Sequence, residues 1–382
     1  MATLLTRLRL GPIVDDVEQP SLVIKARRWI MVISLLLAVF GTIMVFSAST
    51  VLSYRNHNIA YNYGLNHVLS VAVGLVVMFF AMRISQRKWK QLALWLLSAT
   101  TLVLLATFVL GSAVGGQQNW IAVGGIKLQP SEFAKISLVL CIAIAAGMIN
   151  ADAPDWKRFW RQVCLISGLL IGPVVLAGDA GTPAVMVHLA LGLVIICGAS
   201  WRSISYAGAV LFVGGVAIVM RKAYRLERLG SNWFDPSADS SGGGYQSTHG
   251  QYAIAGGGWF GTGLGSGREK WGGLPAAHTD FILASTAEET GVITAALVIA
   301  ALGLLAFWFL RIALLHQELM PRAVCAGVGI WLGWQSIVNI AMVVGVFPVI
   351  GVTLPLVSYG GSSMIATLAG IGMGLSFLKV ER

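Results

Sequence analysis

Charged side chains are scarce in this 382-residue sequence: they make up 11% of the chain, against 57% for apolar residues. So few charges exclude a soluble two-domain protein of this length. Runs of about 20 apolar residues recur along the chain, and each is long enough to cross a hydrocarbon core of about 30 Å. The composition therefore predicts an integral membrane protein.

The sequence also lacks the motifs of several enzyme classes. HExxH, paired CxxC and GxSxG are absent, so zinc-hydrolase and serine-hydrolase functions have no support. The GTGLGSG stretch at 261–267 has glycine spacings reminiscent of nucleotide loops, but no Lys-Ser/Thr ending follows it, and we interpret it as a tight turn. The four cysteines lie in apolar segments at unrelated spacings and are interpreted as packing residues rather than disulfide or metal partners: Cys141, Cys164, Cys197 and Cys325.

The apolar runs predict an all-α polytopic fold with ten transmembrane helices. The first run resembles a signal peptide, but it is too long for one and more runs follow, so we expect it to stay uncleaved. The predicted spans lie near 30–52, 65–83, 91–111, 132–150, 162–177, 183–200, 203–221, 288–311, 322–346 and 360–379.

The net charge of +10 is distributed by side and indicates topology rather than nucleic-acid binding. Basic clusters at 25–28, 87–90 and 157–161 fall on one side of the predicted spans. The short loops on the other side hold only Arg55 and Lys127. Because cytoplasmic loops carry the excess of Lys and Arg, both termini are predicted to be cytoplasmic.

One connection, at about 222–287 between predicted helices seven and eight, is long, rich in glycine and extracytoplasmic. Its apolar patches predict that it is packed, with amphipathic or re-entrant pieces at the membrane surface. Shorter polar segments at 112–131, 178–182 and 347–359 share that face, so a site built there faces outward. Residues 1–28 are expected to form a cytoplasmic tail, and 29–382 a single membrane domain without internal repeats.

Asp280 stands where this polar loop meets an apolar wall, directly before Phe281-Ile282-Leu283. Partial desolvation there would raise the proton affinity of the carboxylate, which suits a general base. A helix N-cap explains the same residue equally well. Glu288 and Glu289 follow at the predicted start of the eighth span, where acidic side chains also suit the helix dipole.

Glu132 and Lys135 are three residues apart at the start of the fourth predicted span, so they share a helix face. Two interpretations remain open: a structural cap with an intramembrane ion pair, or the charged wall of a polar cavity. Asp179, which precedes Pro183, is interpreted as a turn and helix N-terminus.

Basic residues in the long loop complement these carboxylates. Arg225, Arg268 and Lys270 lie on the outer side, against the usual charge bias, and an anionic ligand such as pyrophosphate would account for them. Anchoring to anionic lipid headgroups is the alternative for residues 221–228.

Several stretches resemble the SEDS family (shape, elongation, division and sporulation), which includes the peptidoglycan glycosyltransferases FtsW and RodA. The resemblance extends from about 30 to 379. It is carried in order by NWIAVGGIKLQPSEFAK (119–135), GDAGTPAV (178–185), YRLERL (224–229), GLGSGREKWGGLPAAHTDFILASTAEETG (263–291) and FPVIGVTLPLVSYGGSS (347–363). The approach to Asp280, GSGREKWGGLP, is more similar to the division-type FtsW branch than to the elongation-type RodA branch.

This resemblance implies ten membrane helices and polymerisation of lipid II on the outer membrane face. It also implies a class B penicillin-binding transpeptidase as partner, within a group of division proteins. Asp280 matches the residue regarded as catalytic in the family. A divalent cation, Mg²⁺ or Mn²⁺, would assist near it, although the sequence shows no dedicated ligand cluster. The residues expected to bind substrate are Glu132, Lys135, Arg225, Arg268, Lys270, His278, Thr279, Glu288, Glu289, Ser358 and Ser362.

The predicted chemistry is glycosyl transfer at the division septum. Asp280 would deprotonate the 4-hydroxyl of an incoming lipid II, whose oxygen attacks the reducing-end sugar of the growing glycan and displaces undecaprenyl pyrophosphate. Three alternatives stay open: a lipid II flippase, a non-catalytic scaffold for the transpeptidase, and a role in elongation instead of division.

Overall fold

The computed structural model describes residues 19–114, 117–123, 126–150, 153–220 and 243–378. Seven of its helices are long and apolar enough to cross a membrane: α2, α3, α4, α5, α6, α11 and α12. Two more, α7 and α13, are apolar but only 16 residues long, and α8 has 20 residues. The bounds are α2 Gln19–His57, α3 Asn62–Ala81, α4 Gln86–Leu110, α5 Pro130–Gly147, α6 Trp156–Leu176, α7 Gly181–Ile196, α8 Trp201–Met220, α11 Ile282–Ala313, α12 Leu319–Val343 and α13 Gly361–Ser376.

The all-α polytopic fold predicted from the sequence is therefore confirmed, and each predicted span coincides with a helix, while the number that crosses the bilayer stays a prediction. Several boundaries differ from the expectation; α6, for instance, begins at Trp156 and not at 162. The first helix begins at Gln19 instead of near residue 30. The eighth begins at Ile282, not at 288, because the apolar FILAS segment is itself helical and buried.

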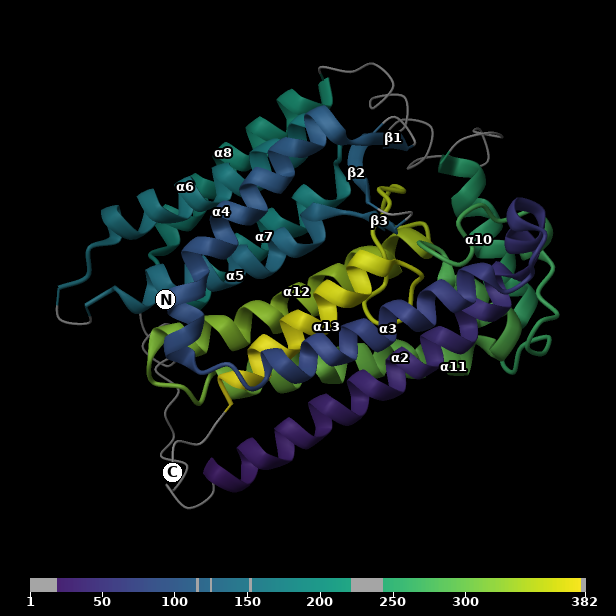
Figure 1. The fold of residues 1–382 in the computed structure, drawn as a ribbon, viewed down its shortest axis with the longest axis horizontal. Helices are drawn as coiled ribbons and strands as arrows, with labels where there is room; N and C mark the ends of the chain where they lie inside the picture. The colour runs from purple at the N-terminus through teal and green to yellow at the C-terminus, as the bar shows by residue number, and fades with distance from the viewer. Residues whose placement is uncertain (1–18, 115–116, 124–125, 151–152, 221–242, 379–382) are drawn as a thin grey trace.

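Helices α5 and α12 form the centre of the bundle, and most of their residues are buried. α5 contacts α4, α6, α7, α12 and α13, while α12 also contacts α7 and α11. α3 packs along α13, and α2 packs against α3 and α11. α2 begins, and α13 ends, at the same end of the bundle (Figure 1). This arrangement agrees with the prediction that the two ends of the membrane region lie on one side.

Short elements gather at the opposite end of the bundle, where the outward-facing segments were predicted (Figure 1). Three short strands form a small antiparallel sheet, β1 (Ser112–Val114), β2 (Gln117–Val123) and β3 (Ile126–Leu128), in the order β1-β2-β3. Ile121 is opposite Leu128, and Ser112 is opposite Trp120. α10 (Gly243–Gly257) lies within the long predicted loop and packs on α11. The sequence interpretation expected re-entrant pieces in that loop but missed the three strands.

Helix α11 is broken at Gly291, whose φ of 89° and ψ of 162° are not helical. At the break, the segment that follows α10 packs against α11 and forms hydrogen bonds with its backbone. The backbone N–H groups of Thr262 and Gly263 donate to the carbonyl oxygens of Glu288 and Glu289, at 2.9 Å each. Because unsatisfied backbone groups are costly at membrane depth, this inserted segment is what makes the break tolerable.

Replacement of Gly291 by Ala is expected to destabilise the protein. The backbone conformation at this position is essentially restricted to glycine, and an added Cβ would lie 2.2 Å from the carbonyl oxygen of Trp259. We expect a loss of about 1–3 kcal/mol, measured as a lowered thermal midpoint in detergent. Gly303→Ala, in the same helix with open space around its Cα, is the matched control and should be neutral or stabilising. Equal midpoints for the two variants would contradict this account of the break.

Candidate active site

The backbone of the turn that carries Asp280 is held by hydrogen bonds donated from two other segments. The amide of Asn339 on α12 donates to the Asp280 carbonyl oxygen at 2.8 Å. The Ser358 hydroxyl donates to the Thr279 carbonyl at 2.7 Å, and the Tyr359 N–H donates to the His278 carbonyl at 2.9 Å. Three successive carbonyl groups are thus held in place, so the backbone from which the Asp280 side chain extends is rigid.

The Asp280 carboxylate is half-buried, and it accepts no hydrogen bond from any residue that the structure describes. α11 begins after Phe281, and no side chain caps its N-terminus, so the capping interpretation of Asp280 is wrong. Burial raises the pKa of Asp280 from its usual 3.8 to about 6. A free carboxylate with this pKa suits a general base near neutral pH.

A small polar cavity of about 30 Å³ adjoins this carboxylate. Gly351 lies between the two: it lines the cavity, and a methyl group added to it would lie 3.7 Å from Asp280 Oδ2. The cavity is also lined by Glu132 and Lys135 of α5, by Gln335 of α12, and by Gln129, Thr182, Val185, Val352 and Thr353. The structure therefore brings the aspartate and the charged pair of α5 to one place.

Glu132 and Lys135 form a buried ion pair, with 2.8 Å between Lys135 Nζ and Glu132 Oε2. Lys135 also donates to Gln335 Oε1 at 2.9 Å and lies 4.9 Å from the centre of the Trp331 ring. The Gln335 amide in turn donates to the Thr353 carbonyl at 2.9 Å. The pair is thus an intramembrane ion pair and also forms the wall of a polar cavity, whereas no side chain caps the N-terminus of α5, so the capping part of the first interpretation is wrong.

Asp179 is a cap at the start of α7, as interpreted from the sequence. Its Oδ1 accepts from the N–H groups of Gly181 and Thr182 at 3.0 and 3.2 Å, and its Oδ2 accepts from the Thr182 hydroxyl at 2.7 Å. The pKa of Asp179 is raised, mainly by burial and also by the nearby Glu132, although the hydrogen bonds from Thr182 and Gly181 act in the opposite direction. With three partners, Asp179 is less available for proton transfer than Asp280.

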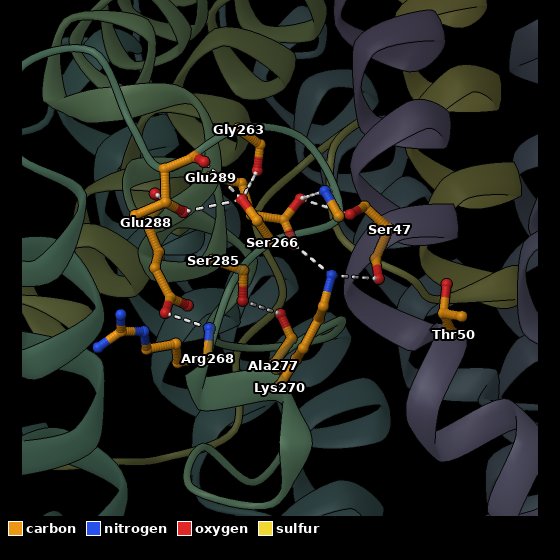
Figure 2. A network of polar contacts seen from close by, with 12 residues as sticks. Ser47, Thr50, Gly263, Ser266, Arg268, Lys270, Ala277, Ser285, Glu288 and Glu289 are labelled. Carbon is orange, nitrogen blue, oxygen red and sulfur yellow. Dashed lines mark hydrogen bonds and ion pairs between the residues drawn. The ribbon is translucent and has the colours of Figure 1, made fainter.

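Glu288 and Glu289 hold the loop before Asp280 in place (Figure 2). Glu288 Oε1 accepts from the N–H groups of Arg268 and Glu269, at 2.6 and 3.2 Å. Glu289 Oε1 pairs with Lys270 Nζ at 2.7 Å, and its Oε2 accepts from the Ser47 hydroxyl on α2 and from a loop N–H group. Both carboxylates are buried. They lie inside α11, before its break, so their predicted place at the helix start is wrong.

The basic residues predicted to bind pyrophosphate differ in their availability. Lys270 is engaged with Glu289, whereas the exposed Arg268 guanidinium has no ion-pair partner among the described residues. Arg225 lies outside the described residues. Between Arg268 and Lys270 in sequence, Glu269 pairs with His249, 2.6 Å away.

Of the other predicted substrate-binding residues, His278 and Thr279 lie in the Asp280 turn and Ser358 contacts it, whereas Ser362 binds Gln129. His278 is buried, its ring centre lies 5.2 and 5.4 Å from those of Tyr63 and Tyr359, and burial lowers its pKa to about 4, so it is neutral at pH 7. The Thr279 hydroxyl donates to a backbone carbonyl. Ser358 and Ser362 both accept backbone N–H groups, which fix the segment after α12.

Sequence reasoning missed Gln335 and Asn339, which connect α12 to both parts of the site. They are four residues apart and point to one face of a predicted membrane span. Polar residues inside a span mark functional positions often enough that this spacing was an available signal. Within the described residues, no three His, Cys, Asp or Glu side chains gather as a metal site, so a divalent cation beside Asp280 stays a prediction.

The chain is similar to proteins of one family in both sequence and structure. The family model for FtsW, RodA and SpoVE, described as a cell cycle protein, matches residues 27–382. A probable peptidoglycan glycosyltransferase FtsW from Aliivibrio salmonicida is 34% identical over 371 residues, which cover 95% of this chain and 91% of the relative. Stage V sporulation protein E from Bacillus subtilis is 31% identical over 358 residues, with 92% and 97% covered.

Solved structures agree. A peptidoglycan synthase complex, described in terms of coordinated polymerisation and crosslinking, contains a chain with a TM-score of 0.75 and 27% identity, over 91% of this chain and 96% of that one. The crystal structure of the rod shape determining protein RodA from Thermus thermophilus gives a TM-score of 0.67 and 26% identity, over 91% and 95%. The chain therefore belongs to the FtsW, RodA and SpoVE family.

Proposed function

We propose that this chain is a peptidoglycan glycosyltransferase that polymerises lipid II on the outer face of the cytoplasmic membrane, with Asp280 as general base. The observation that carries the proposal is a rigidly held carboxylate that accepts no hydrogen bond within the described part of the chain, beside a cavity lined by a buried ion pair. Relatives named as probable peptidoglycan glycosyltransferases support the reaction class.

The proposed step is a substitution at an anomeric carbon. The Asp280 carboxylate accepts the proton of the 4-hydroxyl of the GlcNAc in an incoming lipid II. The freed oxygen attacks C1 of the MurNAc at the reducing end of the growing glycan, and a β-1,4 bond forms with inversion. The bond between C1 and the phosphate oxygen breaks, and undecaprenyl pyrophosphate leaves with the electron pair. Because a sugar hydroxyl is a weak nucleophile, removal of its proton in the transition state is where Asp280 contributes.

Negative charge develops on the departing pyrophosphate, so a nearby cation would lower the barrier. Of the three basic residues considered, Arg268 has the guanidinium that is free of carboxylate partners among the described residues. Its backbone N–H is fixed by Glu288, so the side chain extends from an anchored point. We assign Arg268 the role of pyrophosphate binding and Lys270 the role of holding the loop.

A transpeptidase of the class B penicillin-binding type is the proposed partner. The structural similarity to a chain of a complex for polymerisation and crosslinking supports this assignment. The FtsW names among the relatives support a place at the division septum, with elongation as the alternative. A fluorescent fusion that concentrates at mid-cell would support the division role, and one spread along the side wall would support elongation.

Asp280→Asn is expected to abolish glycan polymerisation by the purified protein in complex with its transpeptidase. General bases contribute about 10²–10⁴-fold to the rate, so product from fluorescent lipid II should fall by that factor. The matched control is Asp155→Asn, at the cap of α6, which leaves a side chain that still caps the helix.

Normal polymer from a folded Asp280→Asn variant would refute the role of this residue. No polymer from the wild-type complex, with a transpeptidase shown to be active, would favour a flippase or a scaffold.

The pH dependence should report the ionisation of Asp280. The carboxylate is the active form, and its pKa is about 6, so kcat/KM should rise from pH 5 and level off above pH 7. At pH 5, one unit below the pKa, about tenfold less of the base is ionised, and the rate should fall accordingly. A profile that is flat from pH 5 to 8 would contradict the proposal.

Lys135→Met is expected to destabilise the fold, because it leaves the buried Glu132 carboxylate without its cation. Breaking a buried pair from one side costs about 3–5 kcal/mol, measured as a lowered thermal midpoint. The double variant Glu132→Gln with Lys135→Met removes both charges and should recover most of this loss. If the double variant folds but does not polymerise lipid II, the pair acts in the reaction as well as in the fold.

A further inference from the structure

An open groove of about 690 Å³ lies on the other side of the Lys270 loop, away from the Asp280 cavity, with which it shares no lining residue. One wall is the outer part of α2, from Ile43 to Arg55, and the other is the loop segment from Leu264 to Trp271. The ammonium of Lys270 points across toward Ser47 on α2, one turn before Thr50 (Figure 2). The role of this groove is not accounted for by the glycosyl transfer proposed above.

The groove continues into the bilayer as an apolar stripe on α2. Leu36, Val39 and Ile43 are 63%, 50% and 48% exposed, and their spacing puts them on one helix face. Twelve residues of α-helix separate Ile43 from Arg55, a rise of about 18 Å. This distance is slightly more than half of a hydrocarbon core of about 30 Å, so the groove wall from Ile43 to Arg55 spans the outer leaflet, and the exposed Leu36 and Val39 lie deeper in the bilayer.

The upper rim of the groove carries one uncompensated positive charge. Lys270 is neutralised by Glu289, whereas Arg55 has no carboxylate within ion-pair distance in the described part of the chain. One Arg55 nitrogen donates to the Trp271 carbonyl at 3.0 Å, which holds the guanidinium at the rim and leaves its other donors open. Arg55 is also one of only two basic residues in the short outer loops, so the charge bias of the topology does not explain it.

We propose that this groove binds a bilayer phospholipid with an anionic phosphodiester headgroup, such as phosphatidylglycerol. The headgroup phosphate accepts hydrogen bonds from Arg55, and an acyl chain lies along the α2 wall of the groove, from Arg55 toward Ile43. A single net cation matches a monoanionic phosphodiester, whereas the several negative charges of a polyprenyl pyrophosphate would need more cations. The bound lipid would pack the Lys270 loop against α2.

The test uses the full-length protein in phosphatidylcholine nanodiscs that contain traces of photoactivatable phosphatidylglycerol or phosphatidylcholine. After illumination, mass spectrometry quantifies the labelling of the peptide that spans Ile43 to Arg55. We expect the phosphatidylglycerol probe to label this peptide about fivefold more than the phosphatidylcholine probe, since one basic residue contributes about that factor to binding anionic lipid.

Three variants sharpen the test. Arg55→Gln should reduce labelling by phosphatidylglycerol to the phosphatidylcholine level, Arg55→Lys should keep most of it, and Thr50→Trp should block both probes by filling the groove.

Equal labelling by the two probes, or no effect of Arg55→Gln, would overturn the proposal. Displacement of the probe by equimolar undecaprenyl pyrophosphate would also overturn it and assign the groove to the polyprenyl carrier. None of these results bears on polymerisation by Asp280, which is measured separately.

Discussion

The outer end of this protein depends on one buried amide. Asn339 Nδ2 donates both to the carbonyl of Asp280 and to that of Val352, at 2.8 and 2.6 Å. These two carbonyls belong to segments far apart in sequence, and each would be a lone acceptor at the top of an apolar bundle without the amide. Satisfying them from α12 fixes the aspartate turn against the wall of the Lys135 cavity. The chemistry proposed for Asp280 therefore rests on a residue that is itself fully buried.

Gln335, four residues earlier on the same helix face, holds the charged pair in a similar way. It accepts from Lys135 and Trp331 and donates to the Thr353 carbonyl. Both amides thus fasten the 350–353 segment to α12, one on the side of the base and one on the side of the cation. A rigid site can then form from four separate stretches of chain, because the central, buried helix α12 holds them in place relative to one another.

The sequence was sufficient for the features that periodicity and charge encode. Long apolar runs predicted the helices, and the three-residue spacing of Glu132 and Lys135 predicted their common face. Features decided by tertiary contacts were missed. The early start of α11 follows from burial of FILAS, and the break at Gly291 follows from an inserted segment, neither of which has a local signal. The sheet at 112–128 was accessible in principle, because Gly-Gly pairs separate its short strands.

The cavity beside Asp280, at about 30 Å³, has a consequence for how activity is controlled. Sites for small organic ligands measure about 300–1,000 Å³, so this form of the protein has room for roughly a water molecule and none for a disaccharide. For a sugar to enter this cavity, the cavity would have to widen, and the apparent affinity would then be the intrinsic affinity multiplied by the fraction of molecules in the wider form. A protein that stabilised this wider form would accelerate polymerisation without contributing a single catalytic group.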